Sequence, residues 1–359
     1  MNSIVLKSGR KIGPGNPTFI IAEAGVNHNG STDLAYKLID EAVNAGADAV
    51  KFQSFLADEI ILRKAPKAQY HLETTGSDED QSWYELLKSQ EISNDMHDKI
   101  VTYCKKKNIL FLSTPYDIKS LNKLLEYDIE LIKVASTDNN NIPFLRYMAK
   151  QKVPIILSTA MINIDDIELS IKTIKEQGLD DIIIMQCTGS YPAPIEDTNL
   201  NVMNTFKKKF NLISGYSDHV NSIVPAIVSI GLGSSIYETH FTIDKSLPGP
   251  DHRASLEPSE LKNLIKMIRD GEKSLGLFEK TISKSEEANY SKLKKFLVST
   301  SDIKKDDIFS YKNIFTKRTG GIGLEPKYFD DLIGKKSPID IEINTPITLE
   351  VLNKINEKS

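Results

Sequence analysis

The sequence has few cysteines, no large excess of either charge and no long apolar run, and each lack narrows what the protein can be. Its 359 residues include only two cysteines, Cys104 and Cys187, without the spacing of a zinc site. A disulfide framework is therefore excluded, and we expect buried free thiols in a reducing compartment. A formal net charge of −4 leaves no dominant basic surface for nucleic acid.

No apolar run reaches the ~18 residues that a membrane-spanning helix requires. The first residues also lack the apolar core of a secretion signal. We therefore expect a cytoplasmic protein with neither a nucleic-acid nor a membrane partner. A content of 40% apolar and 26% charged residues is typical of a globular protein, and 359 residues suit one large domain with a small one.

Short apolar runs alternate with longer amphipathic stretches along most of the chain. Eight runs resemble strands: "FIIAEA", "DAVKFQ", "ILFLST", "LIKVAS", "PIILST", "IIIMQCT", "LISGYSD" and "SIYETHF". Such alternation indicates parallel βαβ units and an α/β fold. Eight units favour a (β/α)8 TIM barrel over an open doubly wound sheet, which periodicity alone leaves possible.

Two segments do not follow this alternation. Residues 58–84 are too long for an ordinary connection and contain several aromatic side chains, so we interpret them as a lid.

The second is the C-terminal part of the chain, which has short β-like pieces and no long helix after a charged stretch. We therefore predict a barrel domain over 1–280, a charged linker over 281–291 and a small, mostly β domain over 292–359. A domain of fewer than ~70 residues has a marginal core, so we expect it to lean on a partner surface.

Nearly every predicted strand becomes polar at its C-terminal end, where barrel enzymes keep their chemistry. These residues are Glu23, Lys51, Gln53, Ser113, Thr114, Lys133, Ser136, Ser158, Thr159, Gln186, Thr188, Ser217, His219, Glu238 and His240. One such residue alone is more often just hydrogen-bonded at a strand end. Burying two lysines, two glutamates and two histidines together is costly unless they bind something, so the barrel mouth is the predicted site.

His219 and His240 end two neighbouring predicted strands. Adjacent strands lie ~5 Å apart, so both imidazoles can reach one point in the mouth. Neutral imidazole is a good ligand for divalent transition metals, and two of them leave positions for water and substrate. The alternative is a pair of hydrogen-bonded core histidines, which the nearby Glu23 and Asp218 disfavour.

Lys51 and Lys133 bring two ammonium groups toward the same mouth, together with several hydroxyl groups, those of Ser113, Thr114, Ser136, Ser158 and Ser217. This composition suits a phosphate or a phosphoryl-carboxylate, bound through charge-assisted hydrogen bonds. The alternative is a purely structural role for lysines that extend toward solvent. The glycine-rich residues 320–323 do not have the form of a phosphate-binding loop.

Longer strings of residues carry a more specific signal. In chain order they are "IIAEAGVNHNG", "AGADAVKFQ", "FLSTP", "ILSTAM", "QCTGSYPAP", "GYSDH", "ETHFTIDKSLPGPDHRASLEP" and "TKRTGGIG". Together they resemble the sialic acid synthase family, which condenses phosphoenolpyruvate with an N-acylmannosamine-type sugar. The resemblance runs from about residue 17 to about residue 345. It implies that the small C-terminal domain is an antifreeze-like (SAF, β-clip) domain.

The resemblance also implies roles for individual residues. His219 and His240 match the ligands of Mn²⁺ or Mg²⁺. The positions that bind phosphoenolpyruvate are matched by Lys51, Thr114, Lys133, Ser136, Ser158 and Ser217. Those that handle the sugar and the proton transfers are matched by Glu23, Gln53, Tyr191 and Asp251, and we add Thr188 at the mouth. Arg318 matches an arginine that the other subunit supplies, which implies a domain-swapped homodimer.

The chain departs from the family pattern in three places. Thr137-Asp138 stands where Gly-Glu is common; Asp138 keeps a carboxylate on a shorter side chain, and we retain it as a catalytic candidate with Glu23 and Lys51. Gly189 stands where some members have an asparagine at the phosphate. Thr319 stands where a proline often follows the arginine, and this exchange is expected to loosen the loop.

We therefore predict a metal-dependent N-acetylneuraminate synthase that uses phosphoenolpyruvate and an open-chain N-acylmannosamine and releases phosphate by C–O cleavage. The alternatives are a synthase of legionaminate or another nonulosonate, and an enzyme that takes a sugar 6-phosphate. A non-catalytic carbohydrate-binding barrel is a different class, which the intact Glu23, Lys51, His219 and His240 disfavour. The SAF-like domain and "SLPGPDH" disfavour an aldol synthase of the aromatic pathway.

Overall fold

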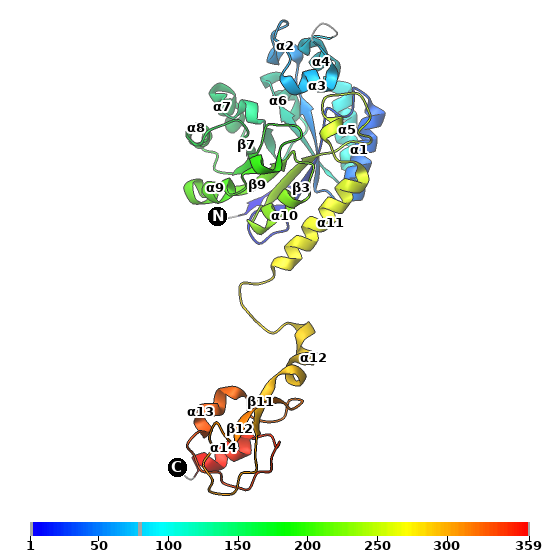
Figure 1. Cartoon of the computed structure of the whole chain (residues 1–359). Helices are drawn as coiled ribbons and strands as arrows, with labels where there is room; N and C mark the ends of the chain where they lie inside the picture. The colour runs from blue at the N-terminus through cyan, green and yellow to red at the C-terminus, as the bar shows by residue number, and fades with distance from the viewer. Residues whose placement is uncertain (1–2, 78–80, 358–359) are drawn as a thin grey trace. The chain divides into compact units, whose positions relative to one another are not determined.

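The computed structural model describes residues 3–77 and 81–357. They form two compact units, the first ending at Gly276 and the second beginning at Leu277, and each is described by itself (Figure 1). Within these described ranges, no helix combines the length and the apolar character needed to cross a membrane.

The first unit is built on eight parallel strands, and they coincide with the eight runs predicted from the sequence. They are β3 (Phe19–Gly25), β4 (Ala49–Ser54), β5 (Leu110–Pro115), β6 (Ile132–Val134), β7 (Ile155–Ser158), β8 (Ile182–Cys187), β9 (Ile213–Asp218) and β10 (Ile236–His240). Their order in the sheet is β5-β4-β3-β10-β9-β8-β7-β6, and the end strands β5 and β6 contact each other. The sheet is thus a nearly closed barrel, which confirms the predicted (β/α)8 fold.

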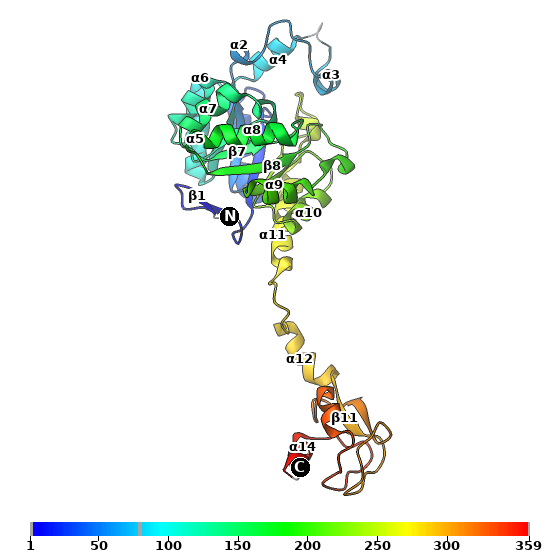
Figure 2. The same ribbon diagram turned by 90° about the vertical axis from the view of Figure 1, so that its left-hand side faces the viewer.

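Helices cover the outside of this barrel (Figures 1 and 2). They are α1 (Thr32–Ala45), α5 (Asn94–Lys107), α6 (Ile118–Leu125), α7 (Ile142–Lys150), α8 (Ile164–Lys175), α9 (Val202–Phe210), α10 (Val224–Gly231) and α11 (Pro258–Leu275). In α1, the Ser31 side chain accepts from the Leu34 N–H, and Gly46 in the left-handed conformation ends the helix. Leu38 and Ala42, one turn apart, are buried against the sheet.

Strand side chains alternate between the lumen and the helical layer, and this alternation divides the core in two. Inward-facing residues such as Ile21, Leu112 and Ile183 form one apolar cluster with Ile4 and Ile12. The latter two belong to the N-terminal hairpin of β1 (Ile4–Val5) and β2 (Lys11–Ile12). The hairpin and the apolar lumen therefore close one end of the barrel, and the polar strand ends occupy the other.

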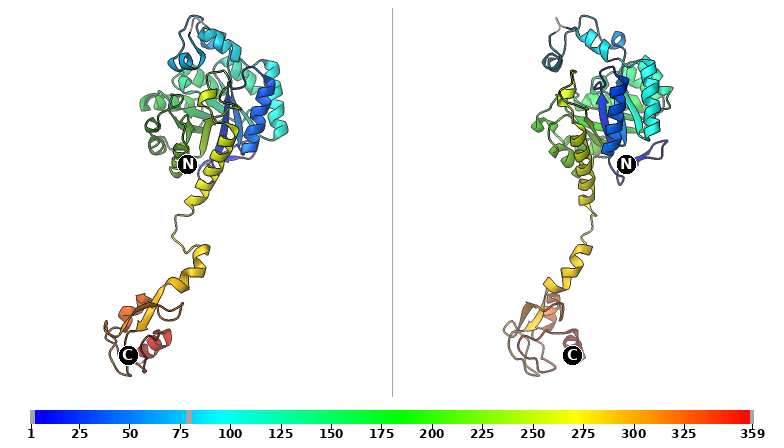
Figure 3. Two further views of the ribbon diagram at one scale, coloured as in Figure 1. Left: turned by 45° about the vertical axis from the view of Figure 1, so that its right-hand side comes forward. Right: turned by 90° about the vertical axis from the view of Figure 1, so that its right-hand side faces the viewer.

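The predicted lid corresponds to an insertion between β4 and α5. It contains α2 (Ala57–Ile60), α3 (Gln69–Thr75) and α4 (Trp83–Gln90). These helices lie at the end of the barrel opposite β1 (Figures 2 and 3). Residues 78–80 of the predicted lid lie outside the described residues.

The second unit begins with α12 (Lys284–Leu293), which occupies most of the stretch predicted as a linker. Strands β11 (Lys295–Ser299) and β12 (Ile314–Arg318) pair antiparallel. The short helices α13 (Phe329–Leu332) and α14 (Leu349–Asn356) follow. Leu297, Phe309, Ile314 and Ile347 are the centre of a separate apolar core. This small antiparallel sheet agrees with the predicted SAF domain.

Candidate active site

Four charged side chains meet in the polar end of the barrel. Lys51 Nζ lies 2.9 Å from Glu23 Oε2 and 3.6 Å from Glu238 Oε2. Lys133 Nζ lies 3.4 Å from Glu238 Oε1. Each of these side chains is at most 5% exposed. Two ammonium groups and two carboxylates compensate one another, which offsets part of the cost of burying them.

Strand register explains why these groups meet. The parallel ladders pair Glu23 on β3 with Lys51 on β4 and with His240 on β10. Because the three residues lie at one level of the barrel and on its inner face, their side chains converge.

Two of the predicted hydroxyl groups join the lysines directly. Lys51 Nζ donates to Thr114 Oγ1 at 3.1 Å, and Lys133 Nζ donates to Ser158 Oγ at 2.7 Å. All four residues are buried. Each ammonium group is therefore fixed in direction, and a phosphate or carboxylate arriving here would meet preorganised donors.

Two other predicted hydroxyl groups have different partners. Ser113 Oγ lies 2.6 Å from Ser54 Oγ, which in turn bonds a histidine of α5. Ser113 precedes Thr114, so alternation turns it away from the lumen and it does not join the cluster. Ser136 Oγ accepts from the Ala160 N–H at 2.9 Å, which ties the loops after β6 and β7 together.

Glu238 is the charged residue of the mouth to which the sequence assigned no role. Ser217 Oγ donates to its Oε1 at 3.0 Å, while its Oε2 accepts no hydrogen bond from the described residues. Burial raises the pKa of Glu238, but Lys133 and Lys51 outweigh burial and lower it to about 2. A glutamate at a strand end carries no sequence signal that separates a structural role from a functional one. The sequence places Glu238 in the mouth, and its convergence with both lysines then shows its role as their counter-charge.

Glu23 has a proton affinity suited to neutral pH. Burial raises its pKa to about 7 against the opposing effect of Lys51. Burial lowers the pKa of Lys133, whereas the carboxylates of Glu23 and Glu238 outweigh burial and raise that of Lys51. A carboxyl group with a pKa near 7 can both accept and donate a proton under ordinary conditions.

The two predicted metal ligands lie side by side. The ring centroids of His219 and His240 are 5.4 Å apart. His219 Nδ1 donates to the Thr188 carbonyl at 2.7 Å, which directs Nε2 away from that bond. His240 Nδ1 lies 3.8 Å from Asp251 Oδ2 and forms no hydrogen bond with the described residues. The Tyr191 ring contacts both, at 4.2 Å from the His219 ring and 5.7 Å from the His240 ring.

These residues fit a divalent cation that takes two ligands from the chain. No cluster of three or more His, Cys, Asp or Glu side chains surrounds one metal position in the described ranges. Burial holds the pKa of His240 well below its ordinary value of 6.5, so the ring is neutral, as a ligand must be. Burial also lowers the pKa of His219, but Cys187 outweighs it and raises the pKa to about 9. A cation on His219 Nε2 would displace that proton.

Three residues predicted to handle the sugar surround Gly25 at the end of β3. A Cβ atom added there would lie 3.4 Å from Asp251 Oδ2 and Gln53 Nε2 and 3.5 Å from Glu23 Oε1. Gly25 has φ +52°, and the β3–β4 register shifts between Glu23 and Gly25. The glycine therefore allows the strand to bulge and leaves room between the polar groups.

The remaining predicted residues lie at the rim of the barrel or belong to the second unit. Asp138 follows β6, accepts from Asn141 Nδ2 at 2.9 Å and has its pKa raised by burial. The Thr188 hydroxyl donates to the Asp197 carbonyl at 2.9 Å, so Thr188 serves the site through its own carbonyl. Arg318 is exposed on β12 of the second unit.

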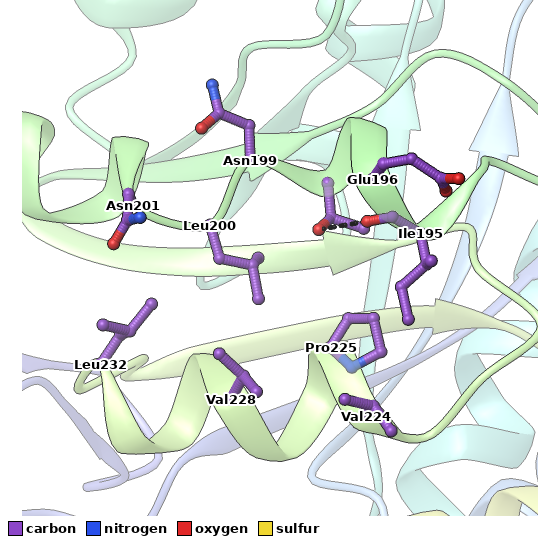
Figure 4. Close-up of a pocket in the computed structure, with 10 residues that line it drawn as sticks. Ile195, Glu196, Asn199, Leu200, Asn201, Val224, Pro225, Val228 and Leu232 are labelled. Atoms are coloured by element: carbon purple, nitrogen blue, oxygen red, sulfur yellow. Dashed lines mark hydrogen bonds between the residues drawn. The ribbon is translucent and has the colours of Figure 1, made fainter.

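A groove on the outer face of the barrel is a different feature (Figure 4). It has a volume of about 330 Å³ and lies between residues 195–201 and α10. Ile195, Val224 and Val228 line it and are exposed, and none of the mouth residues takes part. We place the active site at the mouth because the titratable groups converge there.

Comparison with known proteins covers nearly the whole chain. The model of the NeuB family matches residues 38–280. The N,N'-diacetyllegionaminic acid synthase of Campylobacter jejuni subsp. jejuni serotype O:2 is 43% identical over 320 residues, which cover 89% of this chain and 95% of that protein. The N-acetylneuraminate-9-phosphate synthase of Homo sapiens is 32% identical over 351 residues, which cover 98% of this chain and 97% of that protein.

A solved structure matches both units. The crystal structure of the spore coat polysaccharide biosynthesis protein SpsE of Bacillus subtilis is 35% identical, with a TM-score of 0.67. The match covers 98% of this chain and 99% of that one. The barrel and the small C-terminal unit thus occur together in a relative.

Proposed function

Because this chain belongs to the NeuB family, the sialic acid synthase family that its motifs resemble, we propose that it condenses phosphoenolpyruvate with an N-acylmannosamine-type sugar to a nine-carbon 2-keto acid. The observation that carries the proposal is the buried cluster of Lys51, Lys133, Glu23 and Glu238 beside two histidines. A non-catalytic sugar-binding barrel has no need for so costly an arrangement.

The product we propose is legionaminate, or a close relative of it. The chain is 43% identical to a legionaminate synthase and 32% identical to an N-acetylneuraminate-9-phosphate synthase. This difference favours the legionaminate alternative over the N-acetylneuraminate synthase that was our main prediction. N-acetylmannosamine and its 6-phosphate remain the competing acceptors to be tested.

Phosphoenolpyruvate would bind at the two lysines. Its phosphate and carboxylate groups are both anionic, and Lys51 and Lys133 already point their ammonium groups at the hydroxyls of Thr114 and Ser158. Ser217 adds a third hydroxyl group through its bond to Glu238. Ser136 lies on the loop after β6, three residues after Lys133 along the chain. We propose it as a further contact to phosphoenolpyruvate.

The acceptor sugar would lie on the side of Gly25. Glu23, Gln53 and Asp251 surround this position, and Tyr191 covers the two histidines. A divalent cation held by His219 and His240, Mn²⁺ or Mg²⁺, would supply Lewis acidity toward the sugar aldehyde. Asp138 at the rim would orient the rest of the sugar, and Thr188 would act through the carbonyl group that holds His219.

The bond changes are those of an aldol-type condensation. Carbon 3 of phosphoenolpyruvate forms a bond to the aldehyde carbon, whose oxygen takes up a proton. Water adds to carbon 2, and phosphate leaves as the C–O bond breaks. Glu23, with its pKa of about 7, would position the water and take up its proton. Lys51, held 2.9 Å away, would keep the Glu23 carboxylate in place.

Arg318 requires a second copy of the chain in this proposal. It is exposed, and it belongs to the second compact unit of the chain. We propose a domain-swapped homodimer in which Arg318 of one copy completes the sugar site of the other, as the family resemblance implies.

The test is a phosphate-release assay with phosphoenolpyruvate and a panel of acceptors. The panel holds the N,N'-diacetylated amino sugar, N-acetylmannosamine and N-acetylmannosamine 6-phosphate, each with Mn²⁺ and after chelation. We expect the highest kcat/KM with the diacetylated sugar, and no turnover for His219→Ala, whose far-ultraviolet circular dichroism should stay native. The proposed condensation activity would be refuted if phosphate were released with none of the acceptors. Full turnover under chelation would refute the metal role alone.

A further inference from the structure

Three polar side chains stand together on the outer face of β9 and β10, behind the histidines. Tyr216, Asp218 and Tyr237 are each at most 3% exposed. Both tyrosines belong to the apolar layer between the barrel and its helices. Alternation places them opposite the lumen-facing Ser217 and Glu238, so they do not contact substrate.

Asp218 is the centre of this group. Its Oδ1 accepts from the Tyr216 hydroxyl at 3.0 Å and from the Val220 N–H at 2.9 Å. Its Oδ2 accepts from the Tyr237 hydroxyl at 2.7 Å. The described residues offer Asp218 no lysine or arginine within ion-pair distance. A carboxylate buried in an apolar layer is costly, and these three donors satisfy it in one geometry only.

The bonds of Asp218 enclose His219. Val220, which is bonded to the Asp218 side chain, follows His219 directly, so the three residues form a closed turn. The His219 carbonyl accepts from the Ala193 N–H at 2.8 Å, and its Nδ1 donates to the Thr188 carbonyl at 2.7 Å. The imidazole is thus held through its backbone on both sides and through its ring.

The same group also joins the two histidine-bearing strands. Tyr237 lies on β10, three residues before His240, and its hydroxyl crosses to Asp218 on β9. The ladder pairs Asp218 with Thr239, the residue next to His240. The spacing of the two imidazoles therefore depends on a side-chain bond as well as on the backbone ladder.

We propose that Tyr216, Asp218 and Tyr237 are positioning residues that set the distance and direction of His219 relative to His240. The inference rests on the proposed metal role of the two histidines. Groups that orient ligands from behind cost typically 10–100-fold in metal affinity or activity when they are removed. Loss of one hydroxyl group should therefore weaken metal binding while the residues that bind phosphoenolpyruvate stay intact.

The experiment measures Mn²⁺ binding to the full-length protein by isothermal titration calorimetry, without substrates. The variants are Tyr237→Phe and Tyr216→Phe, and each removes one hydroxyl group that donates a hydrogen bond to Asp218. Tyr103→Phe is the matched control, because its hydroxyl bonds Asp40 at 3.1 Å between α5 and α1, away from the mouth. Thermal unfolding of each variant is recorded alongside.

We expect a Kd for Mn²⁺ about 10-fold higher in Tyr237→Phe than in the wild type, and unchanged in Tyr103→Phe. The kcat should fall with it, while the KM for phosphoenolpyruvate stays within about 3-fold, because its lysines lie on β4 and β6.

A purely structural role gives a different pattern. A lower Tm with unchanged Mn²⁺ affinity in both tyrosine variants would overturn the inference. If Tyr237→Phe does not fold, Tyr216→Phe decides in the same way, since it removes a single bond to the other carboxylate oxygen. If the wild type itself binds no Mn²⁺, the proposed metal role fails and this inference falls with it. Unchanged affinity beside a metal-binding wild type refutes the positioning role alone.

Discussion

At the scale of single residues, the two buried glutamates of the mouth have opposite proton affinities. Both contact Lys51, but Glu238 also contacts Lys133. The second cation lowers the pKa of Glu238 to about 2, whereas burial leaves that of Glu23 at about 7. Glu238 is thus a permanent counter-charge and Glu23 a group that can exchange a proton.

The division of roles predicts the behaviour of Glu23→Gln. The amide is close in shape and can accept a hydrogen bond from Lys51, but it cannot take up a proton. We expect kcat to fall by about 10²–10⁴-fold, the range for loss of a general acid or base. The KM for phosphoenolpyruvate should change little, because Lys133 and Ser158 are untouched.

Steady-state phosphate release measures both constants. Glu168→Gln is a suitable control, since Glu168 on α8 is an acidic residue whose ion pair with Lys209 lies at the surface. A kcat within about 3-fold of the wild type for Glu23→Gln would contradict a proton-transfer role.

His28 gives the folded state a dependence on pH. It is fully buried, and burial lowers its pKa from the ordinary 6.5 to about 4. Between these two values the unfolded chain binds a proton that the folded chain does not. The contribution of neutral, buried His28 to the free energy of unfolding is therefore fully present above pH 6.5 and is lost as the pH falls toward 4. At pH 5 the loss amounts to about 2 kcal/mol of unfolding free energy.

Urea unfolding at pH 7.5 and pH 5 tests this. Because other buried groups also titrate, the comparison is with His28→Gln, which cannot bind a proton at this position. The variant should lose about 1–2 kcal/mol less than the wild type between the two pH values. Equal losses in both proteins would show that His28 does not contribute.

At the residue scale, the sequence predicted which residues belong to the site but not how they are arranged. Lys51, Lys133 and Glu23 were identifiable because charged residues are rare at the ends of apolar strands. Their mutual distances were not, because these depend on the register between strands. Ser113 and Thr114 illustrate this. Both are polar residues at the end of β5, but alternation along the strand lets only Thr114 contact Lys51.

At the scale of secondary structure elements, the apolar runs predicted all eight strands of the barrel. Buried parallel strands are continuous apolar segments, and the helices between them carry caps such as Ser31 and Gly46. The N-terminal hairpin was not predicted, because strands of two residues leave no periodic pattern. Helix α12 was interpreted as linker, since it buries none of its residues and so has no apolar stripe.

The bulge at the end of β3 gives a prediction at this scale. In Gly25→Ala, a methyl group would stand between Glu23, Gln53 and Asp251, on a backbone that L-residues rarely adopt. We expect the free energy of unfolding to fall by about 1 kcal/mol. The kcat/KM for the acceptor sugar should fall by more than about 10-fold, which exceeds the change that 1 kcal/mol would produce.

Gly46→Ala separates the two effects. Gly46 also has a positive φ, +85°, but an added Cβ there meets no atom within 4 Å. It should lose similar stability in urea unfolding and keep its kinetics. Equal kinetics in both variants would mean that the space beside Gly25 is not part of the acceptor site.

At the scale of the whole molecule, the chain combines a barrel with a small unit that has its own core. Glu23, Lys51, Lys133 and Glu238, the charged residues that meet in the mouth, all belong to the barrel. The small unit contributes one predicted site residue, Arg318, which is exposed on β12. The sequence revealed this arginine only through family resemblance, because nothing in its local pattern distinguishes it from a surface residue.

We expect Arg318→Ala to raise the KM for the acceptor sugar by 10-fold or more, about the loss of one charge-assisted hydrogen bond, and to leave the KM for phosphoenolpyruvate nearly unchanged. Lys317→Ala, next to it on β12, is the control. Mixing Arg318→Ala with Lys133→Ala chains should restore activity if the arginine acts on the other copy. Equal effects on both substrates, or no restoration after subunit exchange, would contradict the proposed arrangement.

The most direct test of the whole account is the fate of the oxygen atoms when the enzyme turns over phosphoenolpyruvate and the diacetylated amino sugar in ¹⁸O-labelled water. Water attack on carbon 2 with C–O cleavage predicts unlabelled phosphate together with a nine-carbon keto acid, both seen by mass spectrometry. Release of ¹⁸O-labelled phosphate, which requires P–O cleavage, or formation of no nine-carbon product, would contradict it.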